Sequence, residues 1–267
     1  MATVAHVYED RKMSMGRVFE RAFAAIRANP LVIIGLALAV GAVPSFLATF
    51  LFVQSGYGVP SSGFTSGAIS PLRYFGIIAA SASIGIVINS VVQGALTRAA
   101  VLASEGKSAS FGESLSAGFR VALPLIGLAL VEGIGVMLGM VLLIVPGVIL
   151  ALMWSVAVPA LVVEDGGIGA ALSRSAELTK GARWKILGLY IVSAVALALL
   201  GMLLRFVGLN QYTLATASGL GVATLLGSAI TNTINYTVFG TLWASLYVEL
   251  CQWKEGGSSE QLAEVFG

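Results

Sequence analysis

Charge is scarce in this chain. Only 10% of its 267 residues are Asp, Glu, Lys or Arg, whereas soluble domains carry about 25% charged residues. The hydrophobic fraction is correspondingly high, at 57%. This composition excludes an ordinary soluble domain and predicts a protein that resides in a lipid bilayer.

Residues that perform enzyme chemistry are also scarce. The single histidine, His6, lies in an N-terminal tail, which excludes a Ser-His-Asp triad within the helices. The single cysteine, Cys251, excludes an intrachain disulfide. No His/Cys cluster has zinc spacing, and neither a Walker-type loop nor a dinucleotide-binding glycine motif is found. We therefore expect a non-catalytic protein with no metal and no cofactor.

The chain contains several long apolar segments. A bilayer core about 30 Å thick needs about 20 apolar residues in a helix. Six segments indicate an all-α polytopic protein with six transmembrane helices: Pro30–Val53, Leu72–Ala103, Val121–Leu143, Gly147–Val163, Trp184–Phe206 and Ser218–Leu250. The predicted organisation is a tail with an amphipathic helix (1–29), a six-span membrane domain (30–250) and a C-terminal tail (251–267).

The basic residues predict the orientation. Only Arg73 and Arg205 fall on one side of the predicted spans. Cytoplasmic loops are enriched in Lys and Arg, so both termini are predicted in the cytoplasm. The net charge of +2 does not indicate a nucleic-acid partner. The thirteen basic residues on the other side are Arg11, Lys12, Arg17, Arg21, Arg27, Arg98, Lys107, Arg120, Arg174, Lys180, Arg183, Lys185 and Lys254.

A tight helical hairpin is predicted between the third and fourth spans. Pro146 and Gly147 form a Pro-Gly turn signal there. Gly135 and Gly139, four residues apart, have the small-residue spacing that lets helix backbones approach closely. Pro159 is expected to kink the fourth span.

An internal repeat suggests three hairpin units. Amphipathic segments at residues 15–26, 111–119 and 168–178 precede the odd-numbered spans, as in helices that lie in the membrane interface. Gly35–Gly41 and Gly127–Gly133 match at five of seven positions. We predict that each unit is an interfacial helix followed by a transmembrane hairpin.

Glu132 is an acid inside a predicted span. It lies twelve residues after Arg120, about 18 Å along a helix, and Asn89 and Asn235 are predicted at a similar depth. An acid there is costly and usually faces the bundle interior with a partner. We predict a midplane polar cluster of Glu132, Asn89 and Asn235. It could be a proton, ion or headgroup site, or interhelical hydrogen bonding with Glu132 protonated.

The most distinctive local pattern surrounds the fourth span. It runs through Ile144–Leu150, Val158–Glu164, Ala170–Ser175 and Leu178–Lys185. This pattern resembles the membrane domain attached to some bacterial glycerophosphodiester phosphodiesterases. It is also similar to stand-alone six-span bacterial inner-membrane proteins of unassigned function that are built on that domain.

The resemblance implies a location in the bacterial inner membrane. In that family the hydrolase activity belongs to a separate soluble barrel of about 250 residues. This sequence has no room for such a barrel and no histidine that could serve one, so the family name implies no activity here.

The basic residues of the motif carry the functional prediction. Arg174, Lys180, Arg183 and Lys185, with Glu164 nearby, form a cytoplasmic surface that could bind lipid phosphates. Control of topology is the alternative role of the same charges. We predict a membrane scaffold or phospholipid-interacting module that engages phospholipids or a protein partner at its cytoplasmic face. The alternative is a small transporter or lipid-translocating protein that uses the midplane cluster.

Overall fold

The chain is almost entirely helical in the part that the computed structural model describes, residues 13–54, 71–104, 106–164, 166–207 and 222–266. No strand occurs in these ranges, and the all-α prediction is confirmed. The helices are α2 (Met15–Ala28), α3 (Pro30–Leu36), the π-helix η1 (Ala37–Ala42), α4 (Val43–Gln54), α5 (Pro71–Ser104), α6 (Phe111–Leu142), α7 (Ile144–Met153), α8 (Ala157–Glu164), α9 (Gly167–Thr179), α10 (Arg183–Phe206) and α11 (Val222–Phe266).

Five helical stretches are long and apolar enough to cross a membrane, as judged over the described ranges. They coincide with the first five predicted spans, so the protein is membrane-embedded. Of the sixth predicted span, residues 222–250 lie in α11 and residues 218–221 lie outside the described part of the chain. The helix α11 is not among the five stretches and continues beyond Leu250 to Phe266. The five stretches are Pro30–Ala48, Ala79–Ser104, Phe111–Leu142, Ile144–Glu164 and Arg183–Leu204.

Two spans are interrupted close to a proline. The first contains the π-helix η1, which ends two residues before Pro44. The fourth divides into α7 and α8, which are separated by turn residues 154–156. Pro159 has no amide hydrogen for the carbonyl of Ser155, and its ring disfavours a regular helix over the preceding turn. The expected effect of Pro159 is therefore found as a break just before it.

The hairpin between α6 and α7 reverses direction at Leu143, three residues earlier than the predicted Pro146–Gly147 turn. Leu143 has extended backbone angles (φ −160°, ψ 141°). Pro146 lies in the first turn of α7, where a missing amide hydrogen costs nothing. Gly147 instead serves packing, because a Cβ added to it would lie 2.7 Å from the backbone nitrogen of Met140.

The sequence repeat is not matched by a repeated local structure. Residues 111–119 are not a separate interfacial helix, because α6 runs from Phe111 to Leu142 without a break. Gly35–Gly41 spans the junction of α3 with η1, whereas Gly127–Gly133 lies inside α6. The last two spans also pair weakly, since α11 packs chiefly against α2, α5 and η1. The three-unit organisation remains a prediction.

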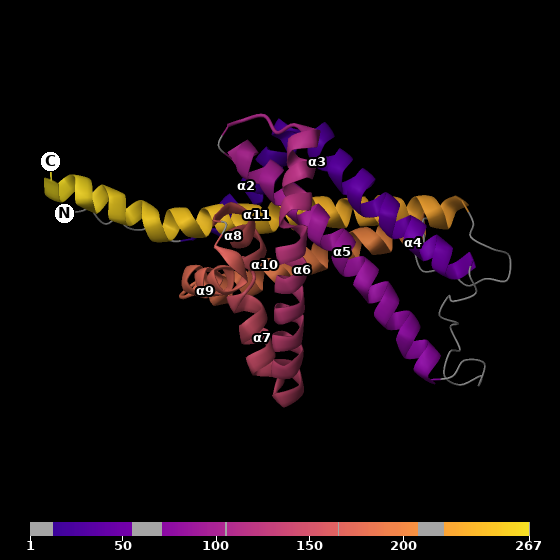
Figure 1. Cartoon of the computed structure of the whole chain (residues 1–267). Coiled ribbons are helices and arrows are strands. Elements are labelled where there is room, and N and C mark those ends of the chain that lie inside the picture. Colours follow the sequence, from indigo (N-terminus) through magenta and orange to yellow (C-terminus); the bar gives the residue numbers. More distant parts are fainter. Residues whose placement is uncertain (1–12, 55–70, 105, 165, 208–221, 267) are drawn as a thin grey trace.

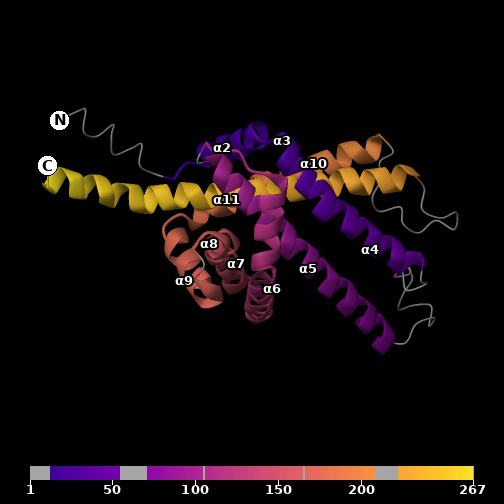
Figure 2. The ribbon, with the colours of Figure 1, turned by 45° about the horizontal axis from the view of Figure 1, so that its top comes forward.

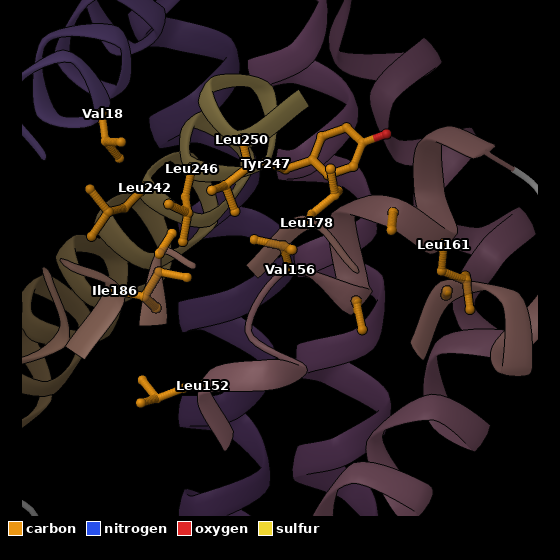
Figure 3. Close-up of a cluster of buried hydrophobic side chains, with 14 of the residues drawn as sticks. Val18, Leu152, Val156, Leu161, Leu178, Ile186, Leu242, Leu246, Tyr247 and Leu250 are labelled. Carbon is orange, nitrogen blue, oxygen red and sulfur yellow. The ribbon is translucent and has the colours of Figure 1, made fainter. Parts of the chain in front are cut away.

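The buried core lies where the helices meet. One cluster joins α2, α6, the α7–α8 segment, α9, α10 and α11. Val18, Leu178, Ile186 and Leu246 come together in it from four different helices (Figure 3). A second cluster joins α3, α5 and α11 through small and branched side chains such as Ile33, Ala95 and Leu96. Together these two clusters are the central core.

Beyond the central core the helices diverge and expose apolar surface. The α6–α7 hairpin, α5 and the α10–α11 pair leave the core in different directions (Figures 1 and 2). Residues 140–145 at the hairpin tip are all exposed, and so are Val192, Leu199 and Leu203 on α10. Apolar patches of this extent are rare on soluble monomers and are typical of lipid or protein contact.

Candidate functional site

Several helices that carry basic residues contact one another at one side of the central core. The N-terminal α2 contacts α11, the end of α5 packs against the start of α6, and α9 packs against α8 and α11. These elements carry Arg17, Arg98, Arg120, Arg174 and Lys254. We call this surface, formed by α2, the α5–α6 connection, α8, α9 and α11 near Glu249, the basic face.

Arg174 of the predicted headgroup cluster is engaged by two carboxylates. Its Nε donates to Glu164 Oε1 at 2.8 Å, and its Nη2 pairs with Glu255 of α11. The hydrogen bonds that Arg174 donates to these two acids raise its pKa above the ordinary value, so it stays charged. Glu164 also accepts a hydrogen bond from Tyr247 Oη at 2.6 Å. This network ties α8 and α9 to α11.

The other basic residues of the predicted cluster occupy different environments. Lys185 Nζ donates to the carbonyl oxygen of Met13 at 2.6 Å, which fastens α10 to the segment before α2. Arg183 is half-buried, and its Nε has no hydrogen-bond partner in the described chain. Lys180 is exposed. Arg174 and Lys185 therefore make structural contacts.

A buried acid that the sequence did not single out lies at the contact of α2 with α11. The side chain of Glu249 is only 2% exposed. Its Oε1 accepts hydrogen bonds from Arg17 Nε at 2.8 Å and from the Ser14 amide at 3.2 Å. Arg21 Nε lies 3.5 Å from Oε2. The acid is thus neutralised by two arginines from the other end of the chain.

A hollow of about 300 Å³ opens on the basic face between α5, α6 and α8. Arg98, Arg120 and Glu113 supply its charges, and Ser116 contributes a hydroxyl. Its apolar wall consists of Ala117, Val121, Val162 and Val163. We call this cavity the α5–α6–α8 hollow.

Local structure explains how these side chains share one hollow. Ser110 caps α6 by accepting a hydrogen bond from the Glu113 amide at 3.1 Å, and the Ser-x-x-Glu spacing is a recognised signal of a helix start. Glu113, Ser116, Ala117 and Arg120 then fall on one face of the helix. A short connection returns the chain from α5 to α6, which brings Arg98 to within 3.5 Å of Glu113.

Close packing of α5 on α6 fixes this arrangement. A Cβ added to Gly118 would lie 2.6 Å from the carbonyl oxygen of Val91, and one added to Gly94 would lie 3.1 Å from the Cα of Gly118. Only glycine fits where backbones approach this closely. The register of the two helices is therefore set within about one turn of Arg98 and of Arg120.

The predicted midplane cluster is not held together by hydrogen bonds. Glu132 Oε1 is buried and has no hydrogen-bond partner among the described residues. Asn89 is exposed on α5, and Asn235 is half-buried on α11. Tyr190 of α10 lies within electrostatic range of Glu132 and packs against Trp243 at a ring-centroid distance of 4.3 Å. Glu132 therefore has an aromatic neighbour rather than an amide partner.

Side chains of α9 satisfy the backbone at the break in the fourth span. Ser175 Oγ donates to the Met153 carbonyl at 2.8 Å and accepts from the Val156 amide at 3.2 Å. Thr179 Oγ1 also donates to the Met153 carbonyl, at 3.2 Å. Unpaired backbone groups are expensive away from water. The helix α9 thus stabilises the broken span through these side-chain hydrogen bonds.

No family model, curated protein or solved structure matches this chain. The resemblance of the pattern at residues 144–185 to the membrane domain attached to glycerophosphodiester phosphodiesterases therefore stays a prediction.

Proposed function

We propose that this protein is a non-catalytic, six-span protein of the bacterial inner membrane that binds anionic phospholipid at its cytoplasmic face. Both termini lie on that face in this proposal. The observation that carries it is the basic face, where helices with basic residues contact one another. Exposed apolar side chains lie close by, since Phe119 and Leu123 flank Arg120 on α6. Anionic headgroups are attracted to such a surface, with a contribution of about 1 kcal/mol for each nearby Lys or Arg.

Some of the basic residues are better explained by structure than by lipid. Arg174 is paired with Glu164 and Glu255, and Lys185 with a backbone carbonyl. Their role in the proposal is to hold α9 and α10 in place, while basic residues without such contacts meet the lipid. The alternative scaffold role is that the basic face binds a protein partner.

Native mass spectrometry of the gently solubilised protein tests the proposal. The measurement compares retention of phosphatidylglycerol, which is anionic, with retention of phosphatidylcholine, which is zwitterionic. We expect phosphatidylglycerol to be retained in clear preference. Equal retention of both lipids would contradict selective binding of anionic phospholipid, and retention of neither would contradict lipid binding and favour a protein partner.

Glu132 supports one alternative, a lipid-translocating protein or small transporter. Its buried Oε1 has no partner, and Gly135, one turn further along α6, packs against Trp154 at the break between α7 and α8. Broken helices at membrane depth often line transport sites. A fluorescent-phospholipid translocation assay in proteoliposomes separates the two functions. A scaffold should not accelerate translocation, whereas a translocator should do so and should lose that activity in Glu132→Gln.

A further inference from the structure

We propose that the α5–α6–α8 hollow is the headgroup site and that it holds the phosphate of one anionic phospholipid between Arg98 and Arg120. The inference rests on the proposed function and locates it at residues outside the predicted cluster. A volume of about 300 Å³ lies at the lower end of ligand pockets. It is suited to a headgroup and leaves the acyl chains outside.

The charges of the hollow match a phosphodiester. Arg98 and Arg120 contribute two positive charges and Glu113 one negative charge, which leaves a net charge of +1. A phosphatidylglycerol headgroup carries one negative charge at its phosphate. Guanidinium groups bind phosphate oxygens in paired, charge-assisted hydrogen bonds, and Ser116 offers a further polar group in the lining.

The arginines are available to a ligand. The Arg98–Glu113 pair is 3.5 Å long, and its side chains are 44% and 51% exposed. Ion pairs this exposed contribute little, so a phosphate can replace the carboxylate. Arg120 makes no ion pair or hydrogen bond within the chain as described. This contrasts with Arg174, which already has two acids.

The surroundings favour a lipid over a free phosphate. Leu123, one turn beyond Arg120 on α6, is 78% exposed, and Phe119 beside it is also exposed. Val163 forms part of the wall of the hollow and is exposed as well. Apolar surface thus begins directly next to the charged hollow, which is the arrangement that a headgroup and its acyl chains require.

The test compares phosphatidylglycerol binding by the full-length protein and three variants in native mass spectrometry. Arg98→Gln/Arg120→Gln removes both cations of the hollow and should weaken retention about tenfold or more, since each tenfold corresponds to one lost strong interaction of about 1.4 kcal/mol. Arg27→Gln/Lys254→Gln is the matched control, because it removes two exposed charges from the same basic face but outside the hollow, and it should weaken retention far less than the loss of Arg98 and Arg120.

Glu113→Gln gives the opposite prediction. It removes the acid that competes for Arg98 and leaves the α6 cap in place, because that cap uses the backbone amide of Glu113. Retention should therefore rise above that of the wild type, a gain that misfolding cannot produce. A Glu113→Gln variant that binds less lipid would overturn the assignment.

The remaining outcomes separate the site from the function. Preferential retention of phosphatidylglycerol that is equal in all four proteins would overturn the hollow as the site while the proposed function stands. No preference in the wild type would overturn both. Displacement of the lipid by an equal concentration of inorganic phosphate would overturn the lipid as ligand and identify a free-phosphate site.

Discussion

The Arg17 guanidinium on α2 donates from Nε to the Glu249 carboxylate on α11 at 2.8 Å, across 232 positions of sequence. The acid is almost wholly buried and each arginine beside it reaches solvent. The helices α2 and α11, the first and last that the structure describes, are therefore joined through a buried ion cluster. Loss of this cluster should weaken the contact between them.

We expect the two sides of this cluster to respond differently to mutation. Arg17→Ala/Arg21→Ala leaves Glu249 buried without compensation, which typically costs about 3–5 kcal/mol. In a chain of this size that corresponds to a fall of roughly 10 °C in the thermal unfolding midpoint. Glu249→Gln should cost less, because both arginines can turn toward water. Differential scanning fluorimetry in detergent measures the thermal unfolding midpoints of these variants and shows which one loses more stability.

Arg27→Ala provides the control for that measurement. It lies in the last turn of the same helix and is exposed, so the midpoint should stay near that of the wild type. If Glu249→Gln proved as damaging as the double variant, burial of the acid would not be the source of the effect.

Tight packing in the α6–α7 hairpin predicts a contrast between two glycines of one helix. A Cβ added to Gly139 would lie 2.9 Å from Gly147 Cα, whereas one added to Gly133 would meet nothing within 4 Å. Gly139→Ala should destabilise the protein by about 1–3 kcal/mol. Gly133→Ala should be neutral or stabilising by up to about 1 kcal/mol, because alanine favours helix. Equal midpoints for the two variants would contradict the packing seen here.

The break in the fourth span should loosen when its side-chain support is removed. Ser175→Ala removes one of the hydrogen bonds that the Met153 carbonyl accepts. It also removes the hydrogen bond that the Val156 amide donates to Ser175 Oγ. Such losses cost about 1–3 kcal/mol. Amide exchange of the peptide covering residues 153–160 should therefore accelerate about tenfold. Ser173→Ala, exposed on the same helix, should exchange like the wild type.

Cys251 should react slowly with thiol reagents at neutral pH. Burial raises the pKa of its thiol above the ordinary value, and this effect outweighs the opposing influence of the neighbouring Tyr247 hydroxyl. The reactive thiolate is the form that burial disfavours. Labelling by a maleimide should therefore become fast only at a pH above that at which a solvent-exposed cysteine ionises.

An exposed cysteine supplies the reference for this labelling. Ser173→Cys in a Cys251→Ser background places a thiol on the solvent side of α9, and it should label rapidly near pH 8. A wild-type protein that labels with the same pH profile would show that Cys251 is not shielded.

The positions of helices along the chain could be predicted from the sequence, because a long uncharged apolar run has few alternatives in a membrane. The same holds for the break before Pro159, which follows from a missing amide hydrogen, and for the close contact at Gly139. These features depend on residues near one another in sequence. The turn at Leu143 was missed by three residues, because proline is as suitable in the first turn of a helix as in the turn before it.

The direction in which each side chain points could not be predicted in the same way. Glu132 and Asn89 were placed at similar depth, yet depth does not determine which face of a helix meets which neighbour. Helices that are apolar on all sides give no amphipathic pattern to orient them. Glu249 was overlooked for the same reason, since its burial depends on α2, more than two hundred residues away.

Part of the α5–α6–α8 hollow could be predicted from the sequence. Arg98 and Arg120 were both assigned to the cytoplasmic side, and the Ser110–Glu113 cap marks the start of α6. What the sequence lacked was the register of α5 against α6, which depends on the contact of Gly94 with Gly118.

The pairing of Glu249 with residues near the N-terminus has a consequence for biogenesis. While the ribosome is still making the middle of the protein, α2 has emerged but the acid that binds its arginines does not yet exist. Arg17, Arg21 and the Ser14 amide must wait until α11 has been synthesised. The central core can therefore close only after translation of the last helix, whatever the order in which the earlier spans enter the bilayer.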